Sequence, residues 1–156
     1  MTENYGENIF FQLQKFKTIA FVPKGNSMYP FIKDRGNTVY ISIKEKRLSP
    51  FDIGLFIRKN GTIVLHRVIE VLEDGYLFCG DSVLESEKVL ENDVIGFLTA
   101  YEKGKKKVDF SNKDREKAEK WYKKSGKRKL RLKLFFFNIR VKNKLKRIFK
   151  REEKWK

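Results

Sequence analysis

Residues 62–79, TIVLHRVIEVLEDGYLFC, decide the fold expected for this chain of 156 residues. Two runs rich in branched side chains, 62–66 and 68–72, precede Asp74-Gly75, and a third run, 76–79, follows it. Asp-Gly between apolar runs is a strong hairpin signal, because both central residues of such a turn favour positive φ. The stretch therefore predicts β-strands joined by a hairpin.

Similar short runs lie on both sides of this stretch. They cover residues 18–22, 39–43, 53–57 and 94–98, with turn signals at 34–37, 49–50, 60–61 and 80–81. Many short strands at this spacing predict a mainly β fold, as a small bent sheet or a partly closed barrel. Before the first strand, Asn8 can cap a short helix with Ile9, Phe10, Leu13 and Phe16 on one side.

Charge divides the chain unevenly. Residues 1–102 contain 12 Lys or Arg and 14 Asp or Glu, whereas residues 103–156 contain 24 and 6, so the net charge of +16 belongs to the last third. We therefore expect three parts: an N-terminal helix or arm (1–17), a β domain (18–102) and a basic helical tail (103–156). Such an asymmetry indicates an anionic partner for the tail.

Two helices are expected in the tail. Ser111 or Asn112 can cap the first, which runs to Lys124, and Gly126 lies where a helix usually stops. The second covers residues 129–151, with an apolar stripe among cations. The stripe is Leu134, Phe137, Val141, Leu145 and Ile148, and the cations are Lys133, Arg140, Lys142, Lys144, Lys146, Arg147 and Lys150. This pattern favours an anionic membrane surface, with nucleic acid or packing against the β domain as alternatives.

The sequence also bears on location. Cys79 is the single cysteine, so no disulfide within the chain is possible and nothing indicates an oxidising compartment. The apolar stretch 9–22 contains Lys15 and Lys17 and falls short of the ~20 apolar residues of a membrane span. Glu3 and Glu7 do not fit a signal peptide. We expect a cytoplasmic protein, peripheral on the inner membrane face if the tail binds lipid, without a cofactor or metal.

Residues 25–30, GNSMYP, hold the first chemical candidate, Ser27. They follow a predicted strand, and Gly25 and Pro30 can shape a turn that presents the serine hydroxyl at the edge of a sheet. Asn26 and Met28 flank Ser27 and are expected to position it or to assist an oxyanion. A loop with an incidental serine is the alternative, because serine is common in turns.

His66 and an acidic residue complete a possible catalytic set. His66, the single histidine, lies within an apolar run, and imidazole has an ordinary pKa of about 6.5, which suits a base for a serine hydroxyl. A core histidine bonded to a backbone carbonyl is the alternative. Asp81 follows Gly80 in a turn and can hold the imidazole in its productive tautomer, or can serve the turn alone. Glu85 and Glu87 can take the same role.

The order of these motifs makes the chain resemble the signal peptidase I and LexA-like serine peptidases. The motifs are Ser-Met-x-Pro at 27–30, Leu-His-Arg-Val-Ile at 65–69 and Gly-Asp at 80–81. Residues 49–56 are similar to the family's Gly-Asp-Ile-Val segment, with Phe51 in the glycine position, and 93–96 are similar to its closing Asp-Val-Ile-Gly strand. Many members use a Ser-Lys dyad. This chain is similar to the branch with His in the lysine position and to stand-alone bacterial members.

The resemblance implies a LexA- or signal-peptidase-like bent sheet and roles for the candidates. Ser27 would attack the scissile carbonyl, His66 would act as general base, and Asp81 would belong to the same site. Glu87 lies near a position where some relatives have a further functional Asp. The backbone N–H of Ser27 would stabilise the oxyanion. Some relatives carry an assisting hydroxyl group at the position of Gly25, and that assistance is either absent here or comes from elsewhere, with the Asn26 side chain as the candidate.

These observations predict a serine endopeptidase that cleaves a leader or precursor peptide, after a small residue as signal peptidases do. The alternative is a catalytically inactive module of the same fold whose basic amphipathic tail binds membrane or nucleic acid. A self-cleaving regulator has little support, because no DNA-binding domain is recognisable in the sequence.

Overall fold

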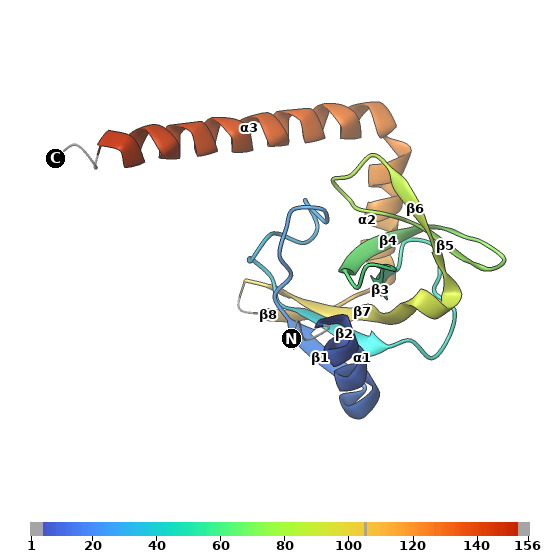
Figure 1. Cartoon of the computed structure of the whole chain (residues 1–156). Helices are drawn as coiled ribbons and strands as arrows, with labels where there is room; N and C mark the ends of the chain where they lie inside the picture. The colour runs from blue at the N-terminus through green and yellow to red at the C-terminus, as the bar shows by residue number, and fades with distance from the viewer. Residues whose placement is uncertain (1–4, 105, 153–156) are drawn as a thin grey trace. The chain divides into compact units, whose positions relative to one another are not determined.

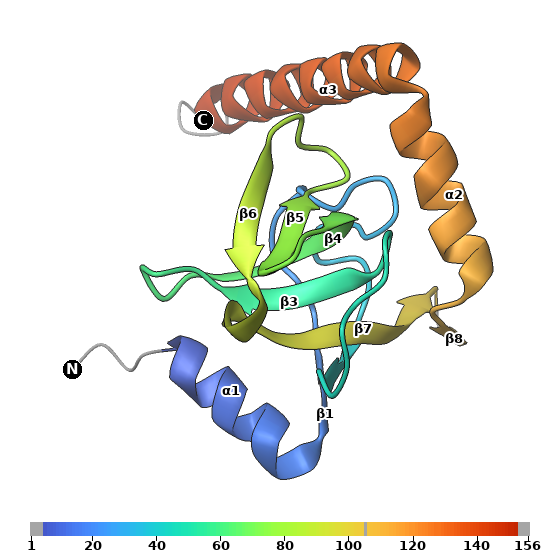
Figure 2. The same cartoon turned by 90° about the vertical axis from the view of Figure 1, so that its right-hand side faces the viewer.

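The structure is a computed structural model that describes residues 5–104 and 106–152. Within these ranges, eight strands form one antiparallel sheet in the order β1-β2-β7-β3-β4-β5-β6, with β8 paired to β7 (Figures 1 and 2). The strands are β1 (Thr18–Phe21), β2 (Val39–Ile43), β3 (Ile53–Ile57), β4 (Ile63–Val71), β5 (Gly75–Cys79), β6 (Ser86–Leu90), β7 (Val94–Lys103) and β8 (Lys106–Asp109). The helices are α1 (Tyr5–Phe16), α2 (Asn112–Lys123) and α3 (Ser125–Glu152), and a 3-10 turn, η1 (Glu91–Asp93), precedes β7.

The chain divides into two compact units, Met1–Ala118 and Glu119–Lys156. The whole sheet belongs to the first unit, and so does the beginning of α2. Arg115 of α2 donates a hydrogen bond of 2.6 Å to the buried carboxylate of Asp52, which precedes β3. The basic segment that begins at residue 103 therefore contributes β8 and the first turns of α2 to the β unit.

Apolar side chains alternate between two clusters of the core. Ile53 and Leu55 of β3 join one cluster, whereas Phe56 joins the other, as expected when successive side chains of a strand point to opposite faces. The first cluster includes Leu13, Met28, Ile32, Val39, Ile41, Leu65, Ile95 and Leu98, and the second includes Leu48, Val64, Val68, Tyr76, Phe78, Val89 and Val94. Because Met28 is only 4 % exposed, it anchors the serine turn in the first cluster.

The predicted β domain with an N-terminal helix and C-terminal helices is confirmed in part: in the described residues the fold is mixed α/β rather than mainly β, an open eight-stranded antiparallel sheet with one short helix before it and two helices after it. The predicted strands 39–43 and 53–57 coincide with β2 and β3, and Asn60-Gly61 joins β3 to β4 with Gly61 at φ +78°. The predicted first tail helix coincides with α2. At its N-terminus, Ser111 N–H and Oγ both donate to the carboxylate of Asp114 at 2.9 and 2.8 Å, and the N–H of Asp114 donates to the carbonyl oxygen of Ser111 at 3.0 Å.

Other predictions were wrong in detail. Runs 62–66 and 68–72 form one strand, β4, with a bulge between Val68 and Glu70 rather than a break. Gly126 is the second residue of α3 and does not end a helix, so the second tail helix begins before residue 129. Gly75 was expected to adopt a positive φ in a turn, but it is the first residue of β5 and its φ is not positive. Glycine is required there because a Cβ would lie 2.1 Å from the carbonyl oxygen of Val89.

Two strands were not predicted, β6 and β8. Both are rich in charged residues, and Val89 is the one residue of β6 that is buried. Among the described residues, no helix is long and apolar enough to cross a membrane.

Candidate active site

Ser27 lies in the turn that follows β1. Gly25 makes this turn possible, because it adopts φ +100° while its N–H donates to Asp34 Oδ1 at 2.8 Å. The carbonyl oxygen of Asn26 accepts the N–H of Tyr29 at 3.0 Å, and that of Met28 accepts the N–H of Ile32 at 2.9 Å. The turn is thus held by its own backbone bonds and by the buried side chain of Met28.

A second turn, between β5 and β6, is bonded to the serine turn. Ser82 N–H donates to the carbonyl oxygen of Ser27 at 2.8 Å, and Ser82 Oγ donates to the carbonyl oxygen of Asn26 at 2.6 Å. Asn26 therefore contributes its backbone carbonyl to the site. Among the described residues, none accepts a hydrogen bond from the N–H of Ser27, so this donor is available to an oxyanion.

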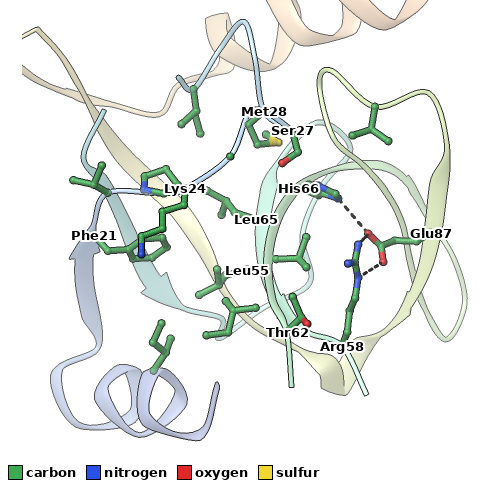
Figure 3. Close-up of a pocket in the computed structure, with 18 of the residues that line it drawn as sticks. Phe21, Lys24, Ser27, Met28, Leu55, Arg58, Thr62, Leu65, His66 and Glu87 are labelled. Carbon is green, nitrogen blue, oxygen red and sulfur yellow. Dashed lines mark hydrogen bonds and ion pairs between the residues drawn. The ribbon is translucent and has the colours of Figure 1, made fainter. Parts of the chain in front are cut away.

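His66 lies on β4 opposite Gly54 of β3 and is 7 % exposed. The loop at Gly80 places His66 beside the serine turn. A Cβ built on Gly80 would lie 2.7 Å from the carbonyl oxygen of Ser27 and 3.1 Å from His66 Nε2. The close approach that only glycine permits thus brings Nε2 towards Ser27, and Figure 3 shows the Ser27 hydroxyl and the His66 ring beside each other. Within the described residues, the side chains of Ser27 and His66 do not form a hydrogen bond with each other. Hydrogen bonds between catalytic groups often form or shorten only when substrate binds.

Glu87 of β6 lies on the other side of the imidazole. Its Oε1 atom is 3.2 Å from His66 Nδ1, which is an ion-pair distance, although the contact does not meet the geometry of a hydrogen bond. Arg58 holds the same carboxylate from the far side, with Nε donating to Oε2 at 2.8 Å and Nη2 donating to Oε1 at 2.7 Å (Figure 3). Arg58 thus contacts Glu87, and Glu87 contacts Nδ1 of His66. The other ring nitrogen, Nε2, takes no part in these contacts.

This arrangement sets the protonation states of the site. Burial lowers the pKa of His66 below its ordinary value, against the opposing charge of Glu87, which raises it, while Arg58 lowers it further. The hydrogen bonds from Arg58 lower the pKa of Glu87, against its own burial, which raises it. Near neutral pH the site therefore holds a neutral imidazole, as a general base requires, beside an ionised carboxylate.

Asp81 is placed differently from the expectation that it would hold the imidazole. Its two oxygens accept hydrogen bonds of 2.7 Å each from Nε and Nη2 of Arg67, and both side chains are at most 1 % exposed. Arg67 also donates to the carbonyl oxygen of Phe51 at 2.9 Å. Glu87 is thus the carboxylate against Nδ1, and Asp81 adjoins the site by fixing the turn that contacts Ser27. The negative charge of Asp81 raises the pKa of His66, but it does so less than the charge of Glu87.

Phe51 adopts φ +68°, a left-handed conformation that glycine takes without strain. Its N–H donates to the carbonyl oxygen of Val68 at 2.8 Å. The backbone geometry that a glycine would provide is therefore kept here by a residue with a side chain.

A pocket of about 900 Å³ contains Ser27, His66 and Glu87 in its lining. Much of the remaining lining is apolar and includes Ile9, Phe21, Met28, Ile32, Leu55, Ile63, Val64 and Leu65. Figure 3 shows four of these, Phe21, Met28, Leu55 and Leu65, together with the polar Lys24 and Thr62. Residues 63–66 of β4 pair with β3 on one side, whereas the pairing of β4 with β5 begins only at Arg67 opposite Cys79. All four residues line the pocket, so their other backbone edge can receive an extended peptide.

The sequence did not identify Arg58 and Arg67 as parts of this site. Arg67 could have been identified from the sequence, because a charged residue within an apolar strand needs a buried partner. Arg58, at the end of β3, could not have been identified in this way. Of the described residues, no cluster of three or more His, Cys, Asp or Glu side chains could hold a metal ion. No protein-family model matches the chain, and no curated protein matches it.

Proposed function

We propose that this chain is a serine endopeptidase of the signal peptidase and LexA-like type, with Ser27 as nucleophile and His66 as general base. The observation that carries the proposal is the approach at Gly80, where the Ser27 backbone and His66 Nε2 converge, while Glu87 lies on Nδ1. A nucleophile, a base and a carboxylate behind the base are the parts that acyl transfer needs.

The chemistry follows from these positions. Ser27 Oγ attacks the scissile carbonyl carbon as its proton passes to Nε2 of His66, and the backbone N–H of Ser27 stabilises the oxyanion. The positive charge that develops on the imidazole is stabilised by Glu87 at 3.2 Å. His66 then gives the proton to the leaving amine, which leaves an acyl-Ser27 ester. Water, deprotonated by His66, hydrolyses the ester and restores the serine.

The substrate class is an extended peptide, as in a leader or precursor segment. The backbone edge of residues 63–66 that faces away from β3, and that does not pair with β5, can pair with it as an added strand, with the scissile bond near His66. The apolar wall of the pocket fits apolar side chains next to that bond. We also propose that the sheet of this chain is the bent sheet of LexA-like peptidases.

Mass spectrometry of a peptide mixture incubated with the whole chain tests the proposal. We expect cleavage by the wild type and none by Ser27→Ala or His66→Ala. A tagged fluorophosphonate should form an adduct at Ser27. Ser86→Ala is the matched control, because Ser86 is an exposed serine that lines the same pocket, and it should retain both cleavage and labelling. Equal cleavage by Ser27→Ala and the wild type would favour the inactive binding module instead.

A further inference from the structure

The side chains of α3 show a surface that the proposed peptidase does not use. Leu134, Phe137 and Val141 are 55, 62 and 40 % exposed, and Leu130, one turn earlier, is 60 % exposed. At 100° per residue, these four positions fall within an arc of about 60° on the helix. Four of the five large apolar side chains that are exposed on the described part of α3 thus form one narrow stripe, the α3 stripe, and the fifth, Phe136, lies outside it.

Cations border the α3 stripe on both sides. Lys133, Arg140 and Lys144 flank one edge and Lys127 and Arg131 flank the other, and all five are exposed. In sequence, α3 contains twelve Lys or Arg and one acidic residue, Glu152. Leu145 and Ile148 continue the predicted stripe, but their side chains lie outside the described residues.

We propose that α3 binds the surface of an anionic lipid bilayer, with the α3 stripe among the acyl chains and the flanking cations at the headgroups. Long Lys and Arg side chains can reach the phosphate level while their methylene groups stay near the apolar face. The charge of the helix complements anionic lipids, and each nearby cation strengthens that attraction. Nucleic acid would use the cations but leave the exposed Phe and Leu side chains without a partner.

Co-sedimentation of the whole chain with phosphatidylcholine–phosphatidylglycerol vesicles tests this proposal. We expect binding that falls as salt rises from about 0.1 M to about 0.5 M, and much weaker binding to pure phosphatidylcholine. Phe137→Ser should lower the partition coefficient by about tenfold. Phe136→Ser is the matched control, since it removes a partly exposed aromatic ring from another side of α3 and should change binding by less than about twofold.

Three results would overturn the proposal. They are equal losses for Phe137→Ser and Phe136→Ser, equal binding to anionic and neutral vesicles, and binding to duplex DNA or RNA without binding to vesicles. Ser27→Ala should bind vesicles as the wild type does. The membrane proposal and the peptidase proposal can therefore fail independently.

Discussion

Replacing Glu87 with Gln removes the carboxylate behind His66 while keeping the shape of the side chain. Two unit charges about 4 Å apart interact by about 4 kcal/mol at an effective dielectric constant of about 20. Glu87 is 31 % exposed and shares its charge with Arg58, so we expect about half of that in the transition state. A loss of about 2 kcal/mol corresponds to about thirtyfold lower kcat/KM.

The pH dependence of kcat/KM gives the direction of the change expected for each variant. His66 must be neutral to accept the proton, so kcat/KM falls as pH drops through its pKa. Glu87 raises that pKa and Arg58 lowers it. Glu87→Gln should therefore move the acidic limb of the profile to lower pH, whereas Arg58→Gln should move it to higher pH.

The assay is kcat/KM against pH on a peptide found to be cleaved, for the wild type and both variants. Thermal unfolding serves as the control, because the Arg58–Glu87 pair is partly exposed and its loss should cost no more than about 1 kcal/mol of stability. Shifts of both variants in the same direction, or an unchanged rate for Glu87→Gln, would refute a role of Glu87 through His66.

Three further substitutions test the frame of the site. Asp81→Asn should lower the unfolding free energy by about 3–5 kcal/mol in denaturant titration, because Arg67 is left buried without its countercharge; a near-neutral result would contradict the buried pair. Gly80→Ala should reduce peptide cleavage at least about tenfold and destabilise the fold by about 1–3 kcal/mol, since its Cβ meets the Ser27 carbonyl; full activity would show that the turn yields. Phe51→Gly should be more stable than Phe51→Ala by about 1 kcal/mol in chemical denaturation, and the opposite order would show that φ +68° carries no strain.

The sequence predicts the central strands because both of their faces are buried. β3 has four buried residues in succession, so its apolar run is unmistakable. β6 has the opposite character, since only Val89 of its five residues is buried and Glu87 and Lys88 break the apolar pattern. Edge strands are stabilised mainly by pairing with a neighbour, which a single run of residues does not reveal.

Some residues of the candidate site can likewise be predicted from the sequence and others cannot. Ser27 and His66 are recognisable from local motifs, and the structure places them beside one another. Which carboxylate contacts the imidazole depends on how β4, β5 and β6 are registered. Cys79 pairs with both Arg67 and Ser86, so Arg67 and Asp81 meet on one side and Glu87, opposite Phe78, reaches His66 on the other.

The two hydrogen bonds from Ser82 have a mechanical consequence. They tie the serine turn to the loop whose Gly80 adjoins His66, whereas His66 itself is held by the pairing of β4 with β3. A displacement of that loop would carry the Ser27 backbone with it and leave β4 behind. The alignment that the proposed peptidase needs thus depends on the short connection between β5 and β6, and a single cut in residues 80–85 would loosen the serine turn while His66 stays in place on β4.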